Sequence, residues 1–156
     1  MVSWNDCQTF IQKLNQLGQG TFRLPTEAEW EYACRAGTTM RFYWEDDPNN
    51  SQIGEYAWYD GNRSRNGTEE AGLKLPNAFG LFDMSGNVWE WCQDLYGNYS
   101  SDSQNDPTGT NSGSLRLSRG GSWEHHGPGS YRSAARYRHG PDETLNDLGF
   151  RLVRNQ

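Results

Sequence analysis

The chain has 156 residues and a formal net charge of −6, and 33% of its residues are hydrophobic. This length suits one domain, residues 1–156, with a core of its own, and the acidic balance disfavours nucleic acid as a partner. No apolar run reaches the length of a membrane span, so we expect no span. No secretory signal peptide is visible, and the sequence does not indicate a cellular compartment.

Three cysteines, Cys7, Cys34 and Cys92, are widely spaced along the chain. An odd number without close spacing predicts neither a disulfide framework nor a zinc site. Cys7 and Cys34 fall within helical patterns, so we expect both thiols to be buried and unreactive. The chain also contains 18 Gly, 7 Trp, 8 Tyr and 6 Phe, which favours a loop-rich fold held by a few large aromatic side chains.

Residues 3–17 are predicted to form an amphipathic helix. Ser3 is a suitable N-cap because Asp6 follows three residues later, and Gly18 or Gly20 would end the helix. Apolar residues recur at helical spacing, at Trp4, Cys7, Ile11 and Leu14. This stripe is expected to face the core.

A second helix is predicted within residues 23–37, RLPTEAEWEYACRAG. Thr26 and Glu29 have the spacing of a capping box, and Gly37 is a suitable C-cap. The two residues at the start of this stretch, 23–24, are expected to form a short strand.

The middle of the chain is predicted to be mostly loop around one clear strand. Residues 38–76 lack a long period, so we expect loops and short strands locked by the aromatic pairs Tyr43–Trp44 and Trp58–Tyr59. The stretch 86–94, GNVWEWCQD, alternates like a strand. Val88, Glu90 and Cys92 would face one side of it, and Trp89 and Trp91 the other. Residues 97–114 are polar throughout and predict a loop.

Two strands frame the last third of the chain. The stretch 115–123, LRLSRGGSW, predicts a strand with a bend at its two glycines, and 148–154, LGFRLVR, predicts a closing strand. Residues 123–147 between them show no period. Seven arginines fall in this third, and we expect several of them to bind loop carbonyls and carboxylates inside the domain. They are Arg116, Arg119, Arg132, Arg136, Arg138, Arg151 and Arg154.

Five stretches together resemble one known family. RLPTEAEWEYACRAG, NAFGLFDMSGNVWEW, RGGSW, RSAAR and LGFRLVR occur in this order, and the resemblance runs from Val2 to Arg154. The family is that of the formylglycine-generating enzyme, or sulfatase-modifying factor, domain. The resemblance implies an α+β fold, a variant of the C-type lectin fold. Such a fold has two helices, a small twisted antiparallel sheet and much irregular loop.

Members of this family divide into enzymes and binding domains. Some oxidise a sulfatase cysteine to formylglycine with a copper-binding cysteine pair, and some are domains of non-haem iron sulfoxide synthases. Others bind without catalysis, including the variable proteins of diversity-generating retroelements. In those proteins the segment from GGSW to GFR is mutagenised and displays a ligand-binding surface. A metal-dependent oxidoreductase, or an accessory domain of one, is therefore the alternative to a binding domain.

The residues present argue against the enzymes. The formylglycine-generating members place two cysteines between the GGS and R.AAR motifs, and the stretch here, 123–131, WEHHGPGSY, contains none. The iron synthases take their metal ligands from a further helical domain that these 156 residues do not include. A new metal site at Glu124, His125, His126 and His139 is not expected, since adjacent side chains diverge in extended backbone. We predict no organic cofactor.

The resemblance also implies a structural calcium site. Carried over by position, Asp83 and Glu90 would supply side-chain oxygens and Gly86 and Val88 backbone carbonyls, and calcium prefers such oxygen ligands. The alternative is that Asp83 and Glu90 bind arginine or backbone N–H groups near the core.

The segment 123–147 is instead predicted to be a ligand-binding surface, because its mixture of Tyr, Ser, Gly, His and Arg is typical of binding loops. Many of its residues are reachable from randomised asparagine codons, as in a retroelement variable protein. The expected partner is a protein or another macromolecule, and a module fused to a kinase or protease is a further hypothesis. The predicted ligand-binding residues are Trp123, Glu124, His125, His126, Gly129, Ser130, Tyr131, Ala135, Tyr137, Arg138, His139, Thr144, Leu145 and Asp147. The predicted fixed anchors are Gly120, Gly121, Trp123, Arg132, Ala134, Arg136 and Phe150.

Overall fold

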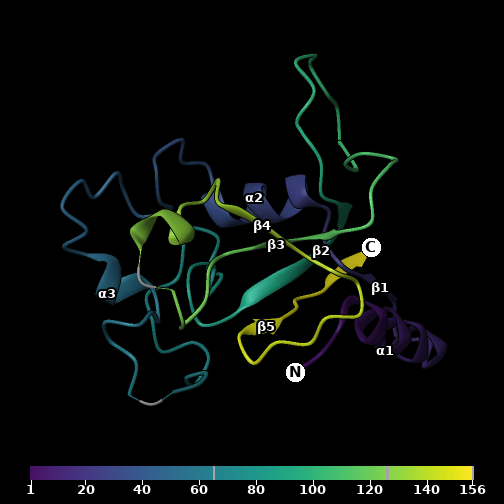
Figure 1. The fold of residues 1–156 in the computed structure, drawn as a ribbon, viewed down its shortest axis with the longest axis horizontal. Coiled ribbons are helices and arrows are strands. Elements are labelled where there is room, and N and C mark those ends of the chain that lie inside the picture. The colour runs from purple at the N-terminus through teal and green to yellow at the C-terminus, as the bar shows by residue number, and fades with distance from the viewer. Residues whose placement is uncertain (65, 126, 156) are drawn as a thin grey trace.

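In the computed structural model, which describes residues 1–64, 66–125 and 127–155, short helices and strands are joined by long loops (Figure 1). The described residues form three α-helices, one 3₁₀ helix and six strands, in the order α1, β1, α2, α3, β2, β3, η1, β4, β5 and β6. The predicted α+β class is therefore confirmed. No described helix is long and apolar enough to cross a membrane.

Helix α1, Trp4–Gln16, begins where its capping box predicts. The Ser3 hydroxyl accepts a hydrogen bond from the Asp6 N–H, and the Asp6 carboxylate accepts one from the Ser3 N–H, both at 3.0 Å. These bonds satisfy two N–H groups that a helix start leaves free. One apolar stripe faces the core, with Trp4, Cys7 and Ile11 buried.

Helix α2, Glu27–Arg35, is also capped as predicted, by Thr26 with Glu29 at the third position. Its end differs from the prediction by one residue, because Ala36 takes the left-handed conformation at φ 47° where Gly37 was expected to cap. Gly37 follows with φ 96°, so the chain turns over two positive-φ residues in succession.

Replacing Thr26 with Ala is expected to lower the free energy of unfolding by about 1 kcal/mol, because the Glu29 N–H would lose its side-chain acceptor. Urea denaturation would measure the change. Thr108→Ala is a matched control, since Thr108 is exposed and lies in a loop. We expect the control to stay within about 0.5 kcal/mol of the parent, and equal losses in both variants would contradict the capping role.

Aromatic stacking holds the loops between α2 and β2, where α3, Ile53–Tyr56, is the one described helix. The Trp44 ring stacks between Phe42, with centroids 4.5 Å apart, and Tyr56, with centroids 4.7 Å apart. Tyr43 meets Trp44 edge-on at 4.9 Å. Offset and edge contacts of this kind fix ring positions as well as burying area, so they order a segment that lacks regular hydrogen bonding.

A four-stranded sheet with the order β4-β3-β2-β5 lies at the centre of the fold (Figure 1). Strands β2, Trp89–Leu95, and β3, Arg116–Arg119, pair antiparallel, as do β3 and β4, Arg136–His139. Strand β5, Leu148–Gly149, runs parallel to β2. Strands β2, β3 and β4 thus pair antiparallel, as expected, and β5 adds one parallel pairing.

The predicted closing strand, residues 148–154, is wrong as a single element. It is split between β5 and β6, Val153–Asn155, and β6 pairs antiparallel with β1, Thr21–Arg23, in a separate two-stranded sheet. Residues 150–152 lie outside both strands. One segment therefore contributes strands to two sheets. The pattern of apolar residues within 148–154 does not show this division, because both halves of the segment have the pattern of a strand.

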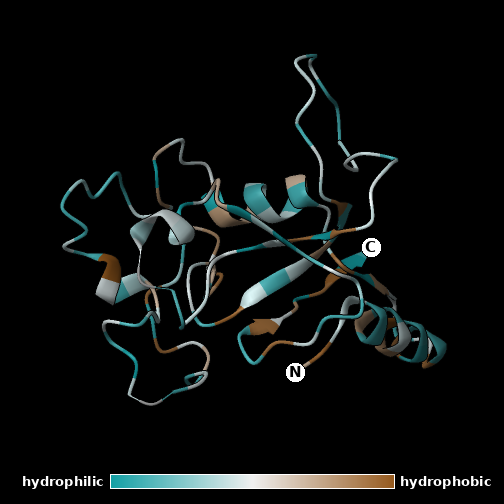
Figure 2. Ribbon diagram, in the orientation of Figure 1, coloured by the Kyte–Doolittle hydropathy of each residue, from teal (hydrophilic) through white to brown (hydrophobic). Residues whose placement is uncertain are grey.

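Both faces of β2 are buried, and its side chains divide between the two faces as the alternating sequence predicts. Trp89 and Trp91 pack in one core cluster with the α1 stripe and Leu148. Cys92, from the other face, packs in a second cluster with Trp30 of α2. Figure 2 shows the contrast in hydropathy between the hydrophobic β5 and the largely hydrophilic outer turns of α1. The polar stretch 97–114 projects from the body as a long loop, as predicted (Figure 1).

Candidate functional site

The predicted ligand-binding segment, residues 123–147, is more regular than expected. It contains a 3₁₀ helix, η1 (Pro128–Tyr131), and β4, which pairs with β3 from Arg116↔His139 to Arg119↔Arg136. The expectation of loops without secondary structure is therefore wrong for these two stretches. Because side chains alternate along a strand, Tyr137 and His139 share one face of the sheet and Arg138 lies on the other.

The structure divides the predicted ligand-binding residues by exposure. Exposed are Glu124, Tyr137, Arg138, Thr144 and Leu145. Half-buried are His125, Gly129 and Ser130. Buried are Trp123, Tyr131, Ala135, His139 and Asp147. His126 lies outside the described residues. The buried group cannot offer much area to a ligand in this conformation, and the anchors Arg132 and Ala134, expected on the core side, are exposed.

Tyr131 and Asp147 are buried because they hold the segment in place. The Tyr131 hydroxyl donates to the carbonyls of Ser122 at 3.0 Å and His125 at 2.5 Å, and burial raises the pKa of this phenol well above its usual range. The Asp147 carboxylate accepts from the Ser122 hydroxyl at 2.7 Å, and its carbonyl accepts from the Trp89 N–H at 2.8 Å. We call the residues Trp89, Gly121, Ser122, Tyr131 and Asp147 the frame.

All of the exposed predicted residues except Thr144 line a surface hollow of about 430 Å³. Its lining residues are Trp89, Glu124, His125, Tyr137, Arg138, His139, Glu143, Leu145, Asn146 and Asp147. Trp89, Glu143 and Asn146 were not predicted as site residues. The sequence did contain a signal for Trp89. Because Trp89 alternates with Val88 and Glu90 along the strand, its side chain must lie on the opposite face from theirs.

Aromatic rings form the floor and one wall of the hollow. Tyr137 stacks on Trp89 with centroids 5.5 Å apart and an interplanar angle of 29°. His125 meets the same Trp89 ring edge-on at 5.3 Å, and His139 lies 5.0 Å from Tyr137. Tyr137 is 49% exposed whereas Trp89 is 2% exposed, so the accessible aromatic surface belongs mainly to Tyr137.

Ser122 and Asp147 fix the tautomer of His125. The Ser122 hydroxyl has one proton and donates it to the Asp147 carboxylate. The Ser122 hydroxyl oxygen also lies 3.0 Å from His125 Nδ1. That oxygen must then accept, so Nδ1 carries the hydrogen in the neutral ring. His125 Nε2 is consequently left with a lone pair that can accept a hydrogen bond.

The cysteines lie away from this hollow and are buried. Among its described lining residues there is no cysteine. Burial raises the pKa of both Cys7 and Cys34 to about 12 and that of Cys92 well above its usual range. A thiolate is the nucleophile and the metal ligand, so none of the three thiols is arranged for either role. The expectation that Cys7 and Cys34 are buried is confirmed.

We expect native protein at pH 8 to resist thiol labelling. Because all three sulfur atoms are buried and protonated, a thiol reagent should modify fewer than one site per chain within minutes. In urea the same reagent should modify all three, which mass spectrometry would count. Fast labelling of one cysteine in the native protein would contradict the thiol burial described above.

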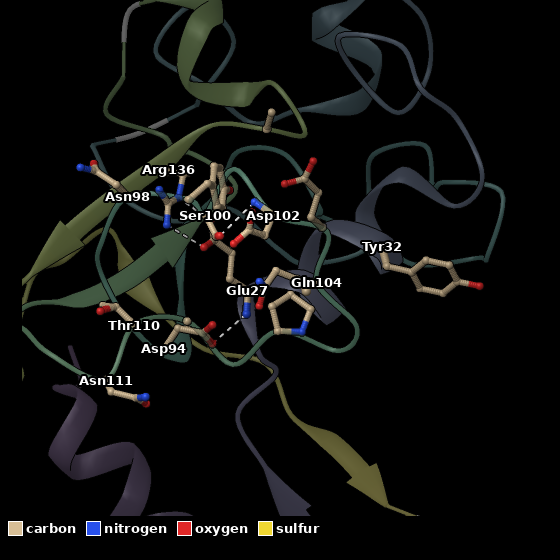
Figure 3. A pocket seen from close by; sticks show the side chains of 16 residues that line it. Glu27, Tyr32, Asp94, Asn98, Ser100, Asp102, Gln104, Thr110, Asn111 and Arg136 are labelled. Carbon is tan, nitrogen blue, oxygen red and sulfur yellow. Dashed lines mark hydrogen bonds and ion pairs between the residues drawn. The ribbon is translucent and has the colours of Figure 1, made fainter.

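A larger cavity, about 800 Å³, lies between α2 and the loop 98–111 (Figure 3). Its two buried carboxylates, Glu27 and Asp94, already have hydrogen-bond donors. Arg136 donates to both oxygens of Glu27, at 2.6 and 2.8 Å, while the Tyr99 hydroxyl donates to Glu27 at 2.9 Å. Asp94 accepts from the Glu27 N–H at 2.8 Å. Since these groups satisfy one another, we interpret them as structural, and Arg136 keeps its predicted role as an anchor.

Comparison with known proteins places this geometry in a family. Residues 1–156 match the model of the sulfatase-modifying factor enzyme 1-like domain. The chain belongs to this family. It is 37% identical over 165 residues to a formylglycine-generating enzyme of Streptomyces coelicolor, covering 97% of this chain and 51% of the relative. An inactive C-alpha-formylglycine-generating enzyme 2 of Mus musculus is 34% identical over 165 residues, covering 97% of this chain and 47% of the relative.

Solved structures agree with the family. Treponema denticola variable protein 1 is 39% identical, with a TM-score of 0.78, over 85% of this chain and 47% of that chain. PvdO from Pseudomonas aeruginosa is 30% identical, with a TM-score of 0.87, over 99% of this chain and 60% of that chain. The predicted C-type lectin-like fold of the sulfatase-modifying factor domain is thereby confirmed. The chain spans about half the length of the curated relatives it matches.

The calcium site implied by the sulfatase-modifying factor family does not fit the residues as they lie. Both Glu90 oxygens are taken, by Arg151 Nε at 2.6 Å and Nη2 at 2.7 Å, and Trp30 Nε1 adds a third donor at 2.6 Å. Asp83 accepts from the Gly72 N–H at 2.7 Å, and burial raises its pKa. A guanidinium already neutralises Glu90, so Gly86 and Val88 would face calcium with one free carboxylate. The alternative assignment of Asp83 and Glu90 to internal partners describes this geometry.

Proposed function

We propose that this domain binds a protein ligand without catalysis and that residues 123–147 display the binding surface. One observation carries the proposal: the segment exposes six of the residues that line the hollow, while its buried residues fix the backbone. A surface of this design tolerates changes in the exposed side chains, because the buried residues make the hydrogen bonds that hold the segment. Tyrosine supplies rigid amphipathic contact area there, as it does in antibody loops.

The chemistry of the described residues supports binding rather than oxidation. The three thiols are buried and protonated, and none lines the hollow. The described residues hold no group of three or more His, Cys, Asp or Glu that could bind a metal ion. The likeness to Treponema denticola variable protein 1 supports the finer proposal of a retroelement variable protein. Neighbouring DNA would test that part: an adenine-rich near-copy of the 119–154 coding segment should lie beside a reverse transcriptase gene.

Tyr137→Ala is expected to weaken binding of a selected peptide at least tenfold, because Tyr137 is the exposed aromatic residue over the hollow. Peptides would be selected from a random phage-displayed library on the immobilised domain and measured by calorimetry. Tyr32→Ala is the matched control, since Tyr32 is 68% exposed and lies on α2 outside the hollow. Equal losses in the two variants, or none in either, would reject the proposed surface.

A further inference from the structure

Carboxylates outnumber arginines among the residues that line the hollow. Three carboxylates line it, those of Glu124, Glu143 and Asp147. Asp147 binds the Ser122 hydroxyl, Glu143 lies 3.4 Å from His139 Nδ1, and no described ion pair or hydrogen bond engages the exposed Glu124 side chain. These carboxylates therefore give the hollow a negative potential that its hydrogen bonds only partly offset.

The cation that lines the hollow does not neutralise it. Arg138 is the arginine among the described lining residues, and its guanidinium lies over the Tyr96 ring, 4.8 Å from the centroid. Arg138 leaves β4 on the face opposite to Tyr137 and His139, so its charge is directed away from the aromatic floor. Burial lowers the pKa of His139, which disfavours the charged form of that ring.

The neutral groups of the hollow also suit a cation. The Tyr137 side chain is 49% exposed and its ring stacks on Trp89, and the negative face of an aromatic ring attracts cations. His125 adds an acceptor, because its Nδ1–H is held by Ser122 and its Nε2 keeps a lone pair. A volume of about 430 Å³ lies near the lower end of the range for ligand pockets, about 300–1,000 Å³, which suits one inserted side chain.

We propose that the hollow binds a lysine or arginine side chain of the protein partner. The proposal rests on the function proposed above and names the chemistry of the partner at that site. The aliphatic stem would lie on Tyr137 and Leu145. The charged group would then bind Glu124 and Glu143 and donate a hydrogen bond to His125 Nε2.

Small probes test this chemistry directly. Nα-acetyl-arginine amide and Nα-acetyl-lysine amide would be titrated into ¹⁵N-labelled domain, with Nα-acetyl-citrulline amide as the uncharged analogue of the arginine probe. We expect the cationic probes to shift the Trp89 indole and the backbone signals of residues 137–145, with the citrulline probe at least about fivefold weaker. Equal affinity for citrulline, or stronger binding of Nα-acetyl-glutamate amide, would overturn the proposal.

Two double variants that remove the same charge test whether the probe is attracted by the carboxylates of the hollow or by the net charge of the domain. Glu124→Gln with Glu143→Gln should weaken the arginine probe at least about fivefold. Glu55→Gln with Glu70→Gln removes the same charge from exposed positions outside the hollow and should change its affinity less than about twofold. Similar losses in both double variants would show that net charge, and not this site, attracts the probe.

The selected peptides distinguish failure of this inference from failure of the proposed function. If peptides bind in a Tyr137-dependent way but tolerate replacement of every Lys and Arg by Gln, the binding function stands and the cation proposal fails. If no selected peptide depends on Tyr137 or Leu145, both proposals fail. Loss of Tyr137-dependent binding when one basic residue is replaced by Gln supports both.

Discussion

Replacing Arg119 with Leu is expected to lower the free energy of unfolding by about 3–5 kcal/mol. Arg119 is 0% exposed and ends β3, directly before the glycine bend that leads into the frame. Its guanidinium donates to the Ala135 carbonyl and to Glu31, and its Nε lies 3.6 Å from Glu27. Removing the guanidinium would leave the Ala135 carbonyl and one Glu31 oxygen without this donor, and would take a buried positive charge away from two carboxylates.

Urea denaturation of Arg119→Leu and Arg138→Leu would test this expectation. Arg138 lies on the neighbouring strand but is exposed, so its replacement should cost less than about 1 kcal/mol. A two-state fit with unchanged dependence on urea would show that the loss belongs to the folded state. A cost for Arg119→Leu below about 1.5 kcal/mol would mean that the buried guanidinium does not organise this corner of the sheet.

Gly121→Ala should destabilise the domain by more than about 2 kcal/mol and distort the hollow. Gly121 has φ 78°, and a methyl group there would meet Tyr131 Cδ1 at 2.7 Å and the Ser130 carbonyl oxygen at 2.8 Å. Relief of these contacts must move η1, which carries the tyrosine that binds the Ser122 and His125 carbonyls. Peptide binding should therefore weaken together with stability.

The control variant Gly80→Ala separates the cost of a positive φ from the cost of contact with Tyr131 and Ser130. Gly80 has φ 76°, almost the value of Gly121, but a methyl group there would meet no atom within 4 Å. The control thus isolates the cost of a left-handed alanine, about 1–2 kcal/mol. Equal destabilisation by both substitutions would show that contact with Tyr131 and Ser130 contributes nothing.

Local rules predicted the parts of the fold that depend on neighbouring residues. Both capping boxes, at Ser3 and Thr26, form as the spacing of a hydroxyl and a carboxylate requires. The alternation of residues 88–92 predicted which side chains of β2 share a face. Such signals operate within one turn of helix or one strand, so they need no knowledge of the partner element.

Two predictions that depended on distant partners failed. The split of residues 148–154 between two sheets is decided by β2 and β1, which lie far away in sequence. Exposure within 123–147 was missed for the same reason. Tyrosine is common both in binding surfaces and in buried anchors, and only the carbonyls of Ser122 and His125 decide that Tyr131 is an anchor.

Glu90 has internal partners that its sequence motif does not reveal. The sequence around it, GNVWEW, implied a calcium ligand, yet its carboxylate binds Arg151 and Trp30. Position alone did not show that Arg151 follows β5 and reaches back to β2. A carboxylate shared between a guanidinium and an indole N–H stabilises the joint between α2, β2 and the C-terminal segment.

The central claim is that the frame and the displayed side chains are independent, and one variant tests it most directly. Glu124, Tyr137, Arg138, Thr144 and Leu145 would all be replaced by Ala, and the free energy of unfolding and the affinity for selected peptides would be measured on the same sample. We predict a loss of stability below about 2 kcal/mol, because all five are exposed, and a loss of affinity of at least about 100-fold. Unfolding of the variant, or peptide binding that survives intact, would contradict the account.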